Sequence, residues 1–392
     1  MTKQLQGAAF TQRQLPALGS YQKEDVTFLL SKLSESELVE LYTAPSEKEV
    51  LIQRGIAHYS EMLSREQKPD DRYLQIFEQA LSNYGERMGR DIAWLAVKLG
   101  VKIRGRITLL SLVRAGVPVG VLLLRALREL GRDATHYGIS IIRDRGVDIN
   151  ALNYTLSKHS AQSIVFVDGW TGKGAISNEL ETFLGAHPQL GVDARLVTLA
   201  DPAGRAWLSA SSEDWLIPSG ILGSTVSGLI SRSVLRRDWQ HSSEFHATAQ
   251  LDELAEYDLS RRFVDTIHAH VLTALPAVVD NIKSQDDHFG TPERNHSRKQ
   301  ASEVIRQLAS EFKIENSNRI KPGIAEATRA VLRRVPDRII ISSAKDADLA
   351  ALVHLAMQLG VPVEERGQDI LPYRAITIIA HRGRDAAEQA LL

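Results

Sequence analysis

The sequence predicts an α/β protein in which a helical N-terminal region leads into a parallel sheet with flanking helices and then into a small three-layer α/β domain. Three observations support this fold class. From Lys23 to Leu99, apolar residues recur mainly at helical spacing. From about residue 101, short apolar runs alternate with helical stretches, which is typical of βαβ units. A polar stretch with Gly290 and Pro292 then precedes a last block with its own strands and helices.

These changes in texture divide the chain into segments. We expect a flexible N-terminal arm, one large domain, a linker and a small domain. The large domain consists of a helical part, an α/β core and a closing helix, which Pro276 should interrupt. The predicted boundaries are residues 1–22 for the arm, 23–283 for the large domain (23–100, 101–240 and 250–283 for its three parts), 284–300 for the linker and 301–392 for the small domain.

Apolar runs and the breakers between them predict the individual elements. In the core, we place strands at residues 107–113, 136–142, 164–167 and 194–199 and helices at 121–130 and 175–184. In the small domain, helices are expected at 301–312, 323–334 and 347–359 and strands at 338–343, 361–364 and 375–380. Residues 143–161 are polar and predict a long loop that closes over a binding site. Residues 214–234 mix serine, glycine and threonine with apolar residues, which indicates an ordered segment packed over that site.

Composition excludes several classes of function. The net charge of −1 gives no general attraction to nucleic acids or membranes. The chain contains no cysteine, which excludes disulfides, thiolate metal sites and a cysteine nucleophile. The N-terminus lacks the apolar region of a secretory signal, and the longest apolar block, residues 107–126, is broken by charged residues, glycine and proline. We therefore expect a cytoplasmic protein without membrane contact.

Charge is unevenly distributed along the chain. Residues 298–345 carry 11 Lys or Arg against 5 Asp or Glu, an excess of 6 positive charges. Such an excess indicates either a face that binds a polyanion or a solvated helix surface. Charge alone does not separate these two interpretations.

The strongest candidate for a site is IVFVDGWTGKGAI, residues 164–176. An apolar strand runs into Asp168 and a glycine-rich turn, and a helix follows. Ligands of parallel sheets lie beyond the carboxyl ends of the strands, where free N–H groups of the next helix favour an anion. The spacing is not that of a Walker loop, because Val167 stands where its first glycine is needed and Gly174 where its Ser or Thr is needed. A plain strand-to-helix turn is the alternative.

The neighbouring residues indicate a pyrophosphate-activated ribose as the ligand. The turn Thr171–Gly174 would hold one phosphate, and Asp168 would accept hydrogen bonds from ribose hydroxyls or bind Mg²⁺. Arg114, in a Gly-Pro turn after the neighbouring strand, would contact the diphosphate, while Arg143 and Arg145 would close over it. Cleavage of the carbon–oxygen bond would leave an oxocarbenium-like sugar, so positioning and charge neutralisation would carry catalysis.

These motifs resemble those of type I phosphoribosyltransferases: VFVDGWTGKG resembles their phosphoribosyl diphosphate signature and SLVRAGVP their diphosphate loop. More closely, the set HYSEM, SLVRAGVPVG, IIRDRGVD, VDGWTGKG, STVSGLISRSV and FHA resembles the phosphoribosyltransferase-like proteins of tellurium-resistance stress gene clusters. The resemblance covers residues 20–285. It implies a phosphoribosyltransferase-like sheet, a Mg²⁺-dependent transfer of 5-phosphoribose to an unknown, base-like nitrogenous acceptor, and a homodimer. Proteins of this family have also been called cysteine proteases, a chemistry for which this chain has no cysteine.

The resemblance assigns roles to individual residues. It implies catalytic roles for Asp168, Arg143 and Arg145, with Mg²⁺ on Asp168. It implies phosphoribosyl diphosphate binding by Arg114, Ala115, Gly116, Asp168, Gly169, Thr171, Gly172, Lys173 and Gly174. Because the region beyond the glycine-rich turn must hold the second substrate, we expect the acceptor at Asp201, Ser224, Thr225, Ser227, Gly228 and Arg232. Type I enzymes usually place a second acid where this chain has Gly169.

The C-terminal segments IKPGIAEATRAVLRR and RIIISSAKDAD resemble the kink-turn RNA-binding fold shared by ribosomal-type proteins and the pelota C-terminal domain. Those proteins carry Gly-x-Asn-Glu-x-Thr-Lys at the RNA contact. The corresponding RNA-binding residues are Lys321, Gly323, Glu326, Thr328 and Arg329. Ala325 replaces the asparagine, which removes a base-edge contact but leaves contacts to phosphate. The alternative is a docking or dimerisation domain that keeps the fold.

Three hypotheses of function follow. The first is a phosphoribosyltransferase with a C-terminal RNA-binding domain. The second is a non-catalytic sensor of a nucleotide or of phosphoribosyl diphosphate that acts through RNA binding, which Gly169 favours. The third is an RNA-binding module whose N-terminal part is a scaffold.

Overall fold

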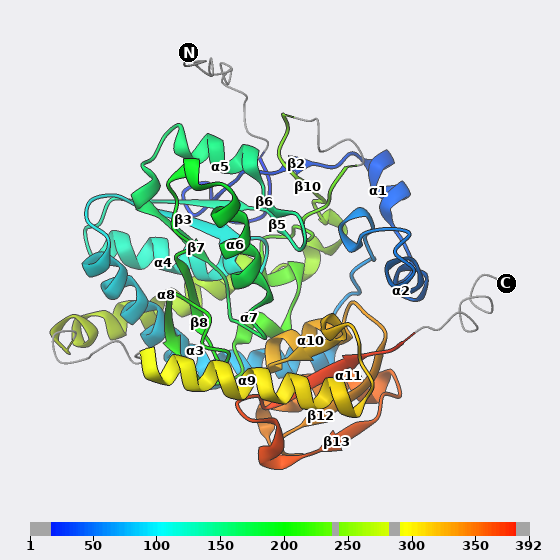
Figure 1. Cartoon of the computed structure of the whole chain (residues 1–392). Helices are drawn as coiled ribbons and strands as arrows, with labels where there is room; N and C mark the ends of the chain where they lie inside the picture. Colours follow the sequence, from blue (N-terminus) through cyan, green and yellow to red (C-terminus); the bar gives the residue numbers. More distant parts are fainter. Residues whose placement is uncertain (1–16, 237–242, 282–290, 382–392) are drawn as a thin grey trace.

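The computed structural model describes residues 17–236, 243–281 and 291–381, so the predicted arm lies almost entirely outside the described residues. Two sheets organise the chain, one in each domain, as Figure 1 shows. The predicted class, a mixed α/β fold with a parallel sheet and flanking helices, is confirmed.

The main sheet has six parallel strands in the order β1-β4-β3-β7-β8-β9. Its central strands β3, β7 and β8 are entirely buried, as expected when helices cover both faces. Their bounds are Thr27–Phe28 for β1, Ala134–Ile139 for β4, Ile107–Leu112 for β3, Ile164–Val167 for β7, Leu196–Ala200 for β8 and Leu208–Ser211 for β9.

Alternating side chains of this sheet reach two hydrophobic clusters. Leu109 and Val165 pack on one face with helices α3 (Asp71–Lys102), α4 (Gly116–Glu129) and α8 (Ser260–Asn281). Leu110 and Phe166 pack on the other face with α5 (Ile149–Leu156) and α6 (Ala175–Ala186). The period of two along each strand therefore decides which helices a residue meets.

The region expected to be helical up to Leu99 also contains two short strands. β1 adds an edge to the main sheet, and β2 (Ser31–Lys32) pairs with β10 (Ala247–Thr248). Two residues are too few to show a strand period, so neighbouring strands decided this structure. The sequence Ser34-Glu35-Ser36-Glu37 predicts a capped helix start, and helix α1 (Glu35–Leu41) begins there because Ser34 and Glu37 form a capping box. The remaining elements are α2 (Pro45–Gln53) and η1 (Tyr59–Glu61).

The prediction of a long loop over residues 143–161 is wrong. A hairpin of β5 (Ile141–Ile142) and β6 (Gly146–Val147) is followed directly by α5. Asp148 makes this possible, since its buried carboxylate accepts hydrogen bonds from the N–H groups of Asn150 and Ala151 and so caps the helix. Only the short turn at residues 143–145 remains between the two strands.

Residues 214–234 are ordered and largely buried, as predicted, and they include α7 (Pro218–Ile221) and η4 (Ser224–Val226). Pro276 lies inside α8 and does not end it, contrary to our expectation. The other short helices of the large domain are η2 (Ala161–Ser163), η3 (Pro188–Leu190) and η6 (Asp252–Tyr257). Within the described ranges, no helix combines the length and apolar character that a membrane crossing requires.

The C-terminal domain has a mixed four-stranded sheet in the order β11-β14-β12-β13. Helix α9 (Thr291–Glu311) covers one face, and α10 (Ile324–Val331) and α11 (Ala350–Gln358) cover the other. Residues 291–300, which we expected in the linker, form the first half of α9. The other elements are β11 (Ile320–Pro322), β12 (Pro336–Ile341), β13 (Val363–Glu365), β14 (Ala375–Ile379), η7 (Ser317–Arg319), η8 (Ala347–Leu349) and η9 (Gly367–Ile370).

The two domains share one hydrophobic core. Ile324, Ala327 and Leu352 of the C-terminal domain belong to the same buried cluster as α3, α4 and α8. Helix α10 packs against α7, and α11 packs against α3. In Figure 1, α10 accordingly lies between the large domain and strands β12 and β13.

Candidate functional site

The two predicted anion-binding turns meet at the middle of the main sheet. The strand order changes direction between β3 and β7, and ligands of open α/β sheets bind at such a switch point. Arg114 follows β3 and Asp168 follows β7. The turns touch each other, because a Cβ placed on Gly116 would overlap the carbonyl of Val167. The structure therefore brings together the residues that the sequence assigned to one site.

Arg114 is occupied by the protein's own carboxylate. It is 4% exposed, forms an ion pair with Glu66, and donates from Nη1 to the Ile230 carbonyl at 2.9 Å. Glu66 Oε2 also accepts hydrogen bonds from the N–H (3.0 Å) and the hydroxyl (2.9 Å) of Ser224. Burial alone would raise the pKa of Glu66, but the charges of Arg114 and Arg333 lower it to about 2. Glu66 thus takes the place that a diphosphate was expected to fill.

Arginines of both domains surround Glu66. Arg114 and Arg232 come from the large domain, and Arg329 and Arg333 come from α10 and the turn after it. Burial lowers the pKa of Arg232 and of Arg329 to about 10, and that of Arg333 further still. Buried like charges repel, so the shared carboxylate of Glu66 stabilises this arrangement.

Asp168 lies beside the C-terminal domain. Its Oδ1 accepts a hydrogen bond from the N–H of Gly169 at 2.8 Å. Burial raises the pKa of Asp168 to about 7, and the charge of Arg329 offsets this only in part. Arg329 itself stacks on the ring of Trp170 at 4.9 Å. A predicted RNA-binding residue therefore neighbours the predicted ribose-binding residue.

Residues of the C-terminal domain also cover the glycine-rich turn after β7. Lys173 donates to the carbonyls of Ser317 and Ile320, both in the C-terminal domain. The Tyr373 hydroxyl donates to the Gly172 carbonyl at 3.1 Å, and a Cβ at Gly172 would overlap the Glu326 carboxylate. Burial and the neighbouring Lys321 lower the pKa of Lys173 to about 7.

Thr171 and Asp201 stabilise the turns of the large domain. The Thr171 hydroxyl donates to Asp201 Oδ1, and both residues are buried. Asp201 also accepts hydrogen bonds from the N–H groups of Arg205 and Ala206, each at 2.8 Å. Asp201 was predicted to bind the acceptor, but its carboxylate has three internal partners.

The other predicted acceptor residues hold the segment 218–234 together. Ser227 donates to the Gly223 carbonyl at 2.9 Å, and the N–H of Gly228 donates to Ser260 at 2.8 Å. Arg232 donates to the carbonyls of Tyr59 and Met62. Ser224 and Thr225 are buried. The segment lies next to Arg114, since Ile230 and Ser224 belong to it, but its polar groups are turned inward.

The predicted RNA-binding residues lie in the interface between the domains. Arg329 is 8% exposed and donates to the carbonyls of Ser219 (3.1 Å) and Leu222 (3.3 Å). Lys321 is also buried and pairs with Glu326 at 3.5 Å. The Thr328 hydroxyl donates to the Ile324 carbonyl within α10, and Gly323, with a φ of +89°, precedes the helix.

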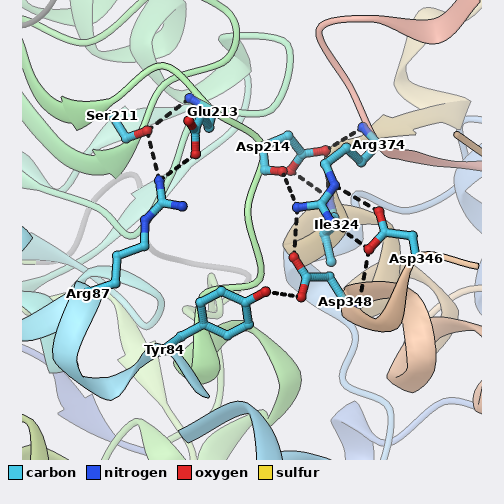
Figure 2. A network of polar contacts seen from close by, with 9 residues as sticks. All are labelled: Tyr84, Arg87, Ser211, Glu213, Asp214, Ile324, Asp346, Asp348 and Arg374. Carbon is cyan, nitrogen blue, oxygen red and sulfur yellow. Dashed lines mark hydrogen bonds and ion pairs between the residues drawn. The ribbon is translucent and has the colours of Figure 1, made fainter. Parts of the chain in front are cut away.

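Asp214 joins the large domain to the start of α10, as Figure 2 shows. Its Oδ1 accepts a hydrogen bond from the N–H of Ile324 at 2.9 Å, and its Oδ2 accepts one from the N–H of Arg374 at 2.8 Å. A carboxylate at this place satisfies a helix N-terminus and interacts favourably with the helix dipole. Burial nevertheless raises the pKa of Asp214 to about 6.

Side chains around Asp214 extend this network (Figure 2). The Arg374 guanidinium forms ion pairs with Asp346 at 2.5 Å and with Asp348 at 2.7 Å. Asp348 accepts a hydrogen bond from the hydroxyl of Tyr84, which belongs to α3 of the large domain. One turn further along α3, Arg87 pairs with Glu213 at 2.7 Å.

A pocket of about 620 Å³ opens at the edge of this interface. It lies between the β5–β6 turn and α6 of the large domain and α9 and η7 of the C-terminal domain. Four basic residues line it, Arg143, Lys173, Arg205 and Arg298, together with two acids, Asp144 and Glu179. Of the predicted catalytic arginines, Arg143 lines the pocket, whereas Arg145 lies exposed on the same turn.

Comparison with known proteins identifies the family. Residues 19–268 match the family described as tellurite-like stress resistance cysteine protease StiP, and residues 299–381 match the PELOTA RNA binding domain. The chain belongs to the StiP family. It is 46% identical over 375 residues to the cysteine protease StiP of Acinetobacter baylyi, an alignment that covers 93% of this chain and 95% of that protein. The resemblance to stress-resistance proteins with a pelota-type domain is thereby confirmed.

The prediction of a phosphoribosyltransferase is wrong, because both the StiP family and the Acinetobacter protein are named cysteine proteases. The predicted enzyme class, pentosyltransferase, is therefore also wrong. The error has a physical cause: an arginine and a lysine beside glycine-rich turns suit a phosphate, but here Arg114 pairs with Glu66 and Lys173 donates to backbone carbonyls. The C-terminal domain also covers the turn, where the Tyr373 hydroxyl donates to the Gly172 carbonyl. The Mg²⁺ site on Asp168 was expected because of the same phosphoribosyltransferase interpretation. Within the described ranges, no group of three or more His, Cys, Asp or Glu side chains could hold a metal ion, and Gly169 follows Asp168 in the sequence where a second acid was expected. The Mg²⁺ site stays a prediction.

The StiP name raises the question of a nucleophile, since the sequence contains no cysteine. Among the residues that the structure describes, three serine hydroxyls approach a histidine ring: Ser60 and His58 at 2.6 Å, Ser111 and His136 at 2.7 Å, and Ser140 and His246 at 2.7 Å. All three serines are fully buried. A buried hydroxyl cannot meet a peptide bond, so these pairs support the structure.

Sequence reasoning missed Glu66 and Asp214. Glu66 stands in SREQKP, and Asp214 follows Glu213 in SEDWL; no local pattern marks either residue as a partner of the other domain. The excess of positive charge over residues 298–345 was the one available signal, because buried cations of the C-terminal domain require acids elsewhere in the chain.

We expect Asp214→Ala to loosen the domain interface. The substitution leaves the N–H groups of Ile324 and Arg374 buried without an acceptor, at a cost of about 1–3 kcal/mol each. Denaturant unfolding should therefore show a loss of several kcal/mol. Glu213→Ala is the matched control: its exposed pair with Arg87 should contribute less than about 1 kcal/mol. Equal effects of the two substitutions would contradict the role given to Asp214.

Asp168 predicts a pH dependence of stability. Its pKa is raised from 3.8 to about 7 in the folded protein, so the folded state retains a proton that the unfolded state releases. Its contribution to stability is therefore present below about pH 4 and is lost as the pH rises to about 7. Asp168→Asn stays neutral and keeps an acceptor for Gly169. Relative to the natural protein, it should gain up to a few kcal/mol of unfolding free energy between pH 5 and pH 8. A difference that does not change with pH would exclude the buried, protonated carboxyl.

Proposed function

We propose that this chain acts as an RNA-binding stress-response protein of the StiP family. The observation that carries the proposal is the match of residues 299–381 to the PELOTA RNA binding domain. Those residues form a complete sheet with helices on both faces, and the domain borders a pocket with four basic residues. The chain as a whole has a charge of −1, so any attraction to RNA must come from such a local concentration of cations.

Contacts to phosphate should dominate this binding. Ala325 stands where related RNA-binding motifs carry asparagine, and it cannot donate to a base edge. Sequence preference should therefore be weak, and affinity should fall steeply with salt because neutralised phosphates release counterions.

We further propose that the chain does not hydrolyse peptides through a thiol. Cysteine proteases require a thiolate nucleophile, and this sequence has none. The Acinetobacter relative is called a cysteine protease, and this chain is 46% identical to it. Fold and family are shared, whereas an activity depends on the particular residues of a site.

The kind of α/β architecture to which the main sheet belongs is also a proposal. All-parallel strands with glycine-rich turns after β3 and β7 favour a phosphoribosyltransferase-like architecture. The likeness concerns the scaffold alone and implies no transfer reaction.

RNA binding can be measured by fluorescence anisotropy with the full chain and a labelled RNA of about 20 nucleotides that contains a single-stranded loop. We expect saturable binding. The logarithm of the dissociation constant should rise linearly with the logarithm of the salt concentration. Scrambling the loop sequence should change the affinity by less than about tenfold. Absence of binding at 50 mM salt would overturn the proposed function.

The proposed absence of thiol-dependent peptide hydrolysis can be tested with labelled casein. The purified chain should leave the substrate intact, with the Acinetobacter StiP protein assayed in parallel as the control for substrate and buffer. Hydrolysis that copurifies with this chain would show that a residue other than cysteine serves as nucleophile, and would refute this part of the proposal.

A further inference from the structure

We infer that the pocket between the domains, lined by Arg143, Arg205 and Arg298, binds the sugar–phosphate backbone of RNA. This inference rests on the proposed function and names its site. It differs from the site expected from sequence, which was the start of α10.

RNA cannot reach the start of α10 in this arrangement of the domains. The Asp214 carboxylate already binds the N–H of Ile324, at the place where a phosphate oxygen would otherwise bind. Arg329 donates to two carbonyls of the large domain, and Lys321 is buried beside Glu326. The residues predicted to contact RNA therefore already bind other groups of the same chain.

The same holds for much of the positive charge of residues 298–345. Lys321, Arg329 and Arg333 face the interface, and Arg334 forms an ion pair with the buried Glu49. These cations stabilise the packing of the domains. Arg298, on the exposed first half of α9, is the member of this stretch that reaches the pocket instead.

The pocket keeps an excess of positive charge. Among ion pairs formed within the described ranges, none involves Arg143, Arg205 or Arg298. Arg298 donates to the Gly204 carbonyl at 2.9 Å and Arg205 to the amide oxygen of Asn178 at 3.4 Å. These neutral partners hold the guanidinium groups at the wall without cancelling their charge. Of the two acids, Glu179 accepts a hydrogen bond from the N–H of Asp144 at 2.8 Å.

The dimensions and the remaining lining suit a nucleotide unit. A volume of about 620 Å³ lies in the usual range for small-ligand pockets and holds a phosphate with its ribose, not a duplex. Ser302, Ser317 and Asn318 add neutral polar groups from the C-terminal domain, which can bind ribose hydroxyls. The N-terminus of α6 at Ala175 adds a favourable dipole for an anion. A single-stranded loop or an RNA end therefore fits best.

Charge reversal on one helix gives a matched test of this site. Arg298→Glu should weaken binding of the labelled loop RNA at least about tenfold and lower the salt slope by about 1. Arg306→Glu makes the same change on α9, outside the pocket, where Arg306 is exposed and paired with Glu303. It should change binding less than about threefold.

Arg143→Glu repeats the test from the large domain, and it removes no side-chain contact of α9. Thermal unfolding of each variant checks that it is folded. Equal binding by Arg298→Glu, Arg143→Glu and the natural chain would overturn the inference while leaving RNA binding intact. Tighter binding by Asp214→Ala, with no effect of the pocket variants, would place RNA on the α10 edge and would also overturn it.

Competition with AMP separates an RNA site from a mononucleotide site. We expect unlabelled RNA to displace the probe at a concentration at least about a hundredfold below that of AMP, because several phosphates contribute. Displacement by both at the same concentration would overturn the assignment to RNA. Absence of RNA binding by the natural chain would instead remove the proposed function itself.

Discussion

The N–H groups at the start of a helix need an acceptor, and for α10 that acceptor is Asp214, 110 residues earlier in the chain. This contact ties the C-terminal domain to the large domain, and the remaining contacts are arranged around it. The start of α10 is held against α7, which brings Arg329 over Trp170 and places Tyr373 on the glycine-rich turn. One hydrophobic cluster then runs through both domains. The predicted RNA edge and the predicted phosphate turn therefore cover each other.

Buried charge has a clear distribution in this interface. The C-terminal domain contributes Arg333 and Arg334, and the large domain contributes Glu66 and Glu49 as their partners. Lys321 pairs with Glu326 of its own domain, and Asp214 accepts hydrogen bonds from backbone N–H groups. Breaking such a pair by removing one member is costly, because the other stays buried and uncompensated. This explains why a chain with a net charge of −1 carries a strongly basic stretch. Arg298 of this stretch lines the pocket beside α9, together with Arg143, Lys173 and Arg205 of the large domain.

Hydrogen-bond donors that suit a phosphate also suit a carboxylate or a carbonyl oxygen, and this equivalence misled the sequence-based prediction of function. Lys173 and Arg114 occupy the positions expected of a phosphoribosyl site, yet each donates to an oxygen of its own chain. Family membership corrects the activity without supplying a mechanism, since the cysteine implied by the family's name is missing here. What the chain shares with its relatives is the scaffold and the PELOTA domain.

Local pattern alone determined the α/β class, the strands β3, β7 and β12 and the capped start of α1, because periodicity and capping act over a few residues. The pelota-type domain was predicted from a resemblance, which the family match confirms. It also placed Arg114 and Asp168 at neighbouring strand ends. Tertiary structure decided the rest. The two-residue strand β1 exists only beside β4, and the polar residues after Arg143 fold into a hairpin and a helix because Asp148 caps them. Whether Arg329 contacts RNA or the large domain depends on Asp214 and Ser219, which lie 115 and 110 positions away. Pairings over such separations leave no local trace, since Asp214 is by itself an ordinary acid and Ser219 contributes only its backbone carbonyl.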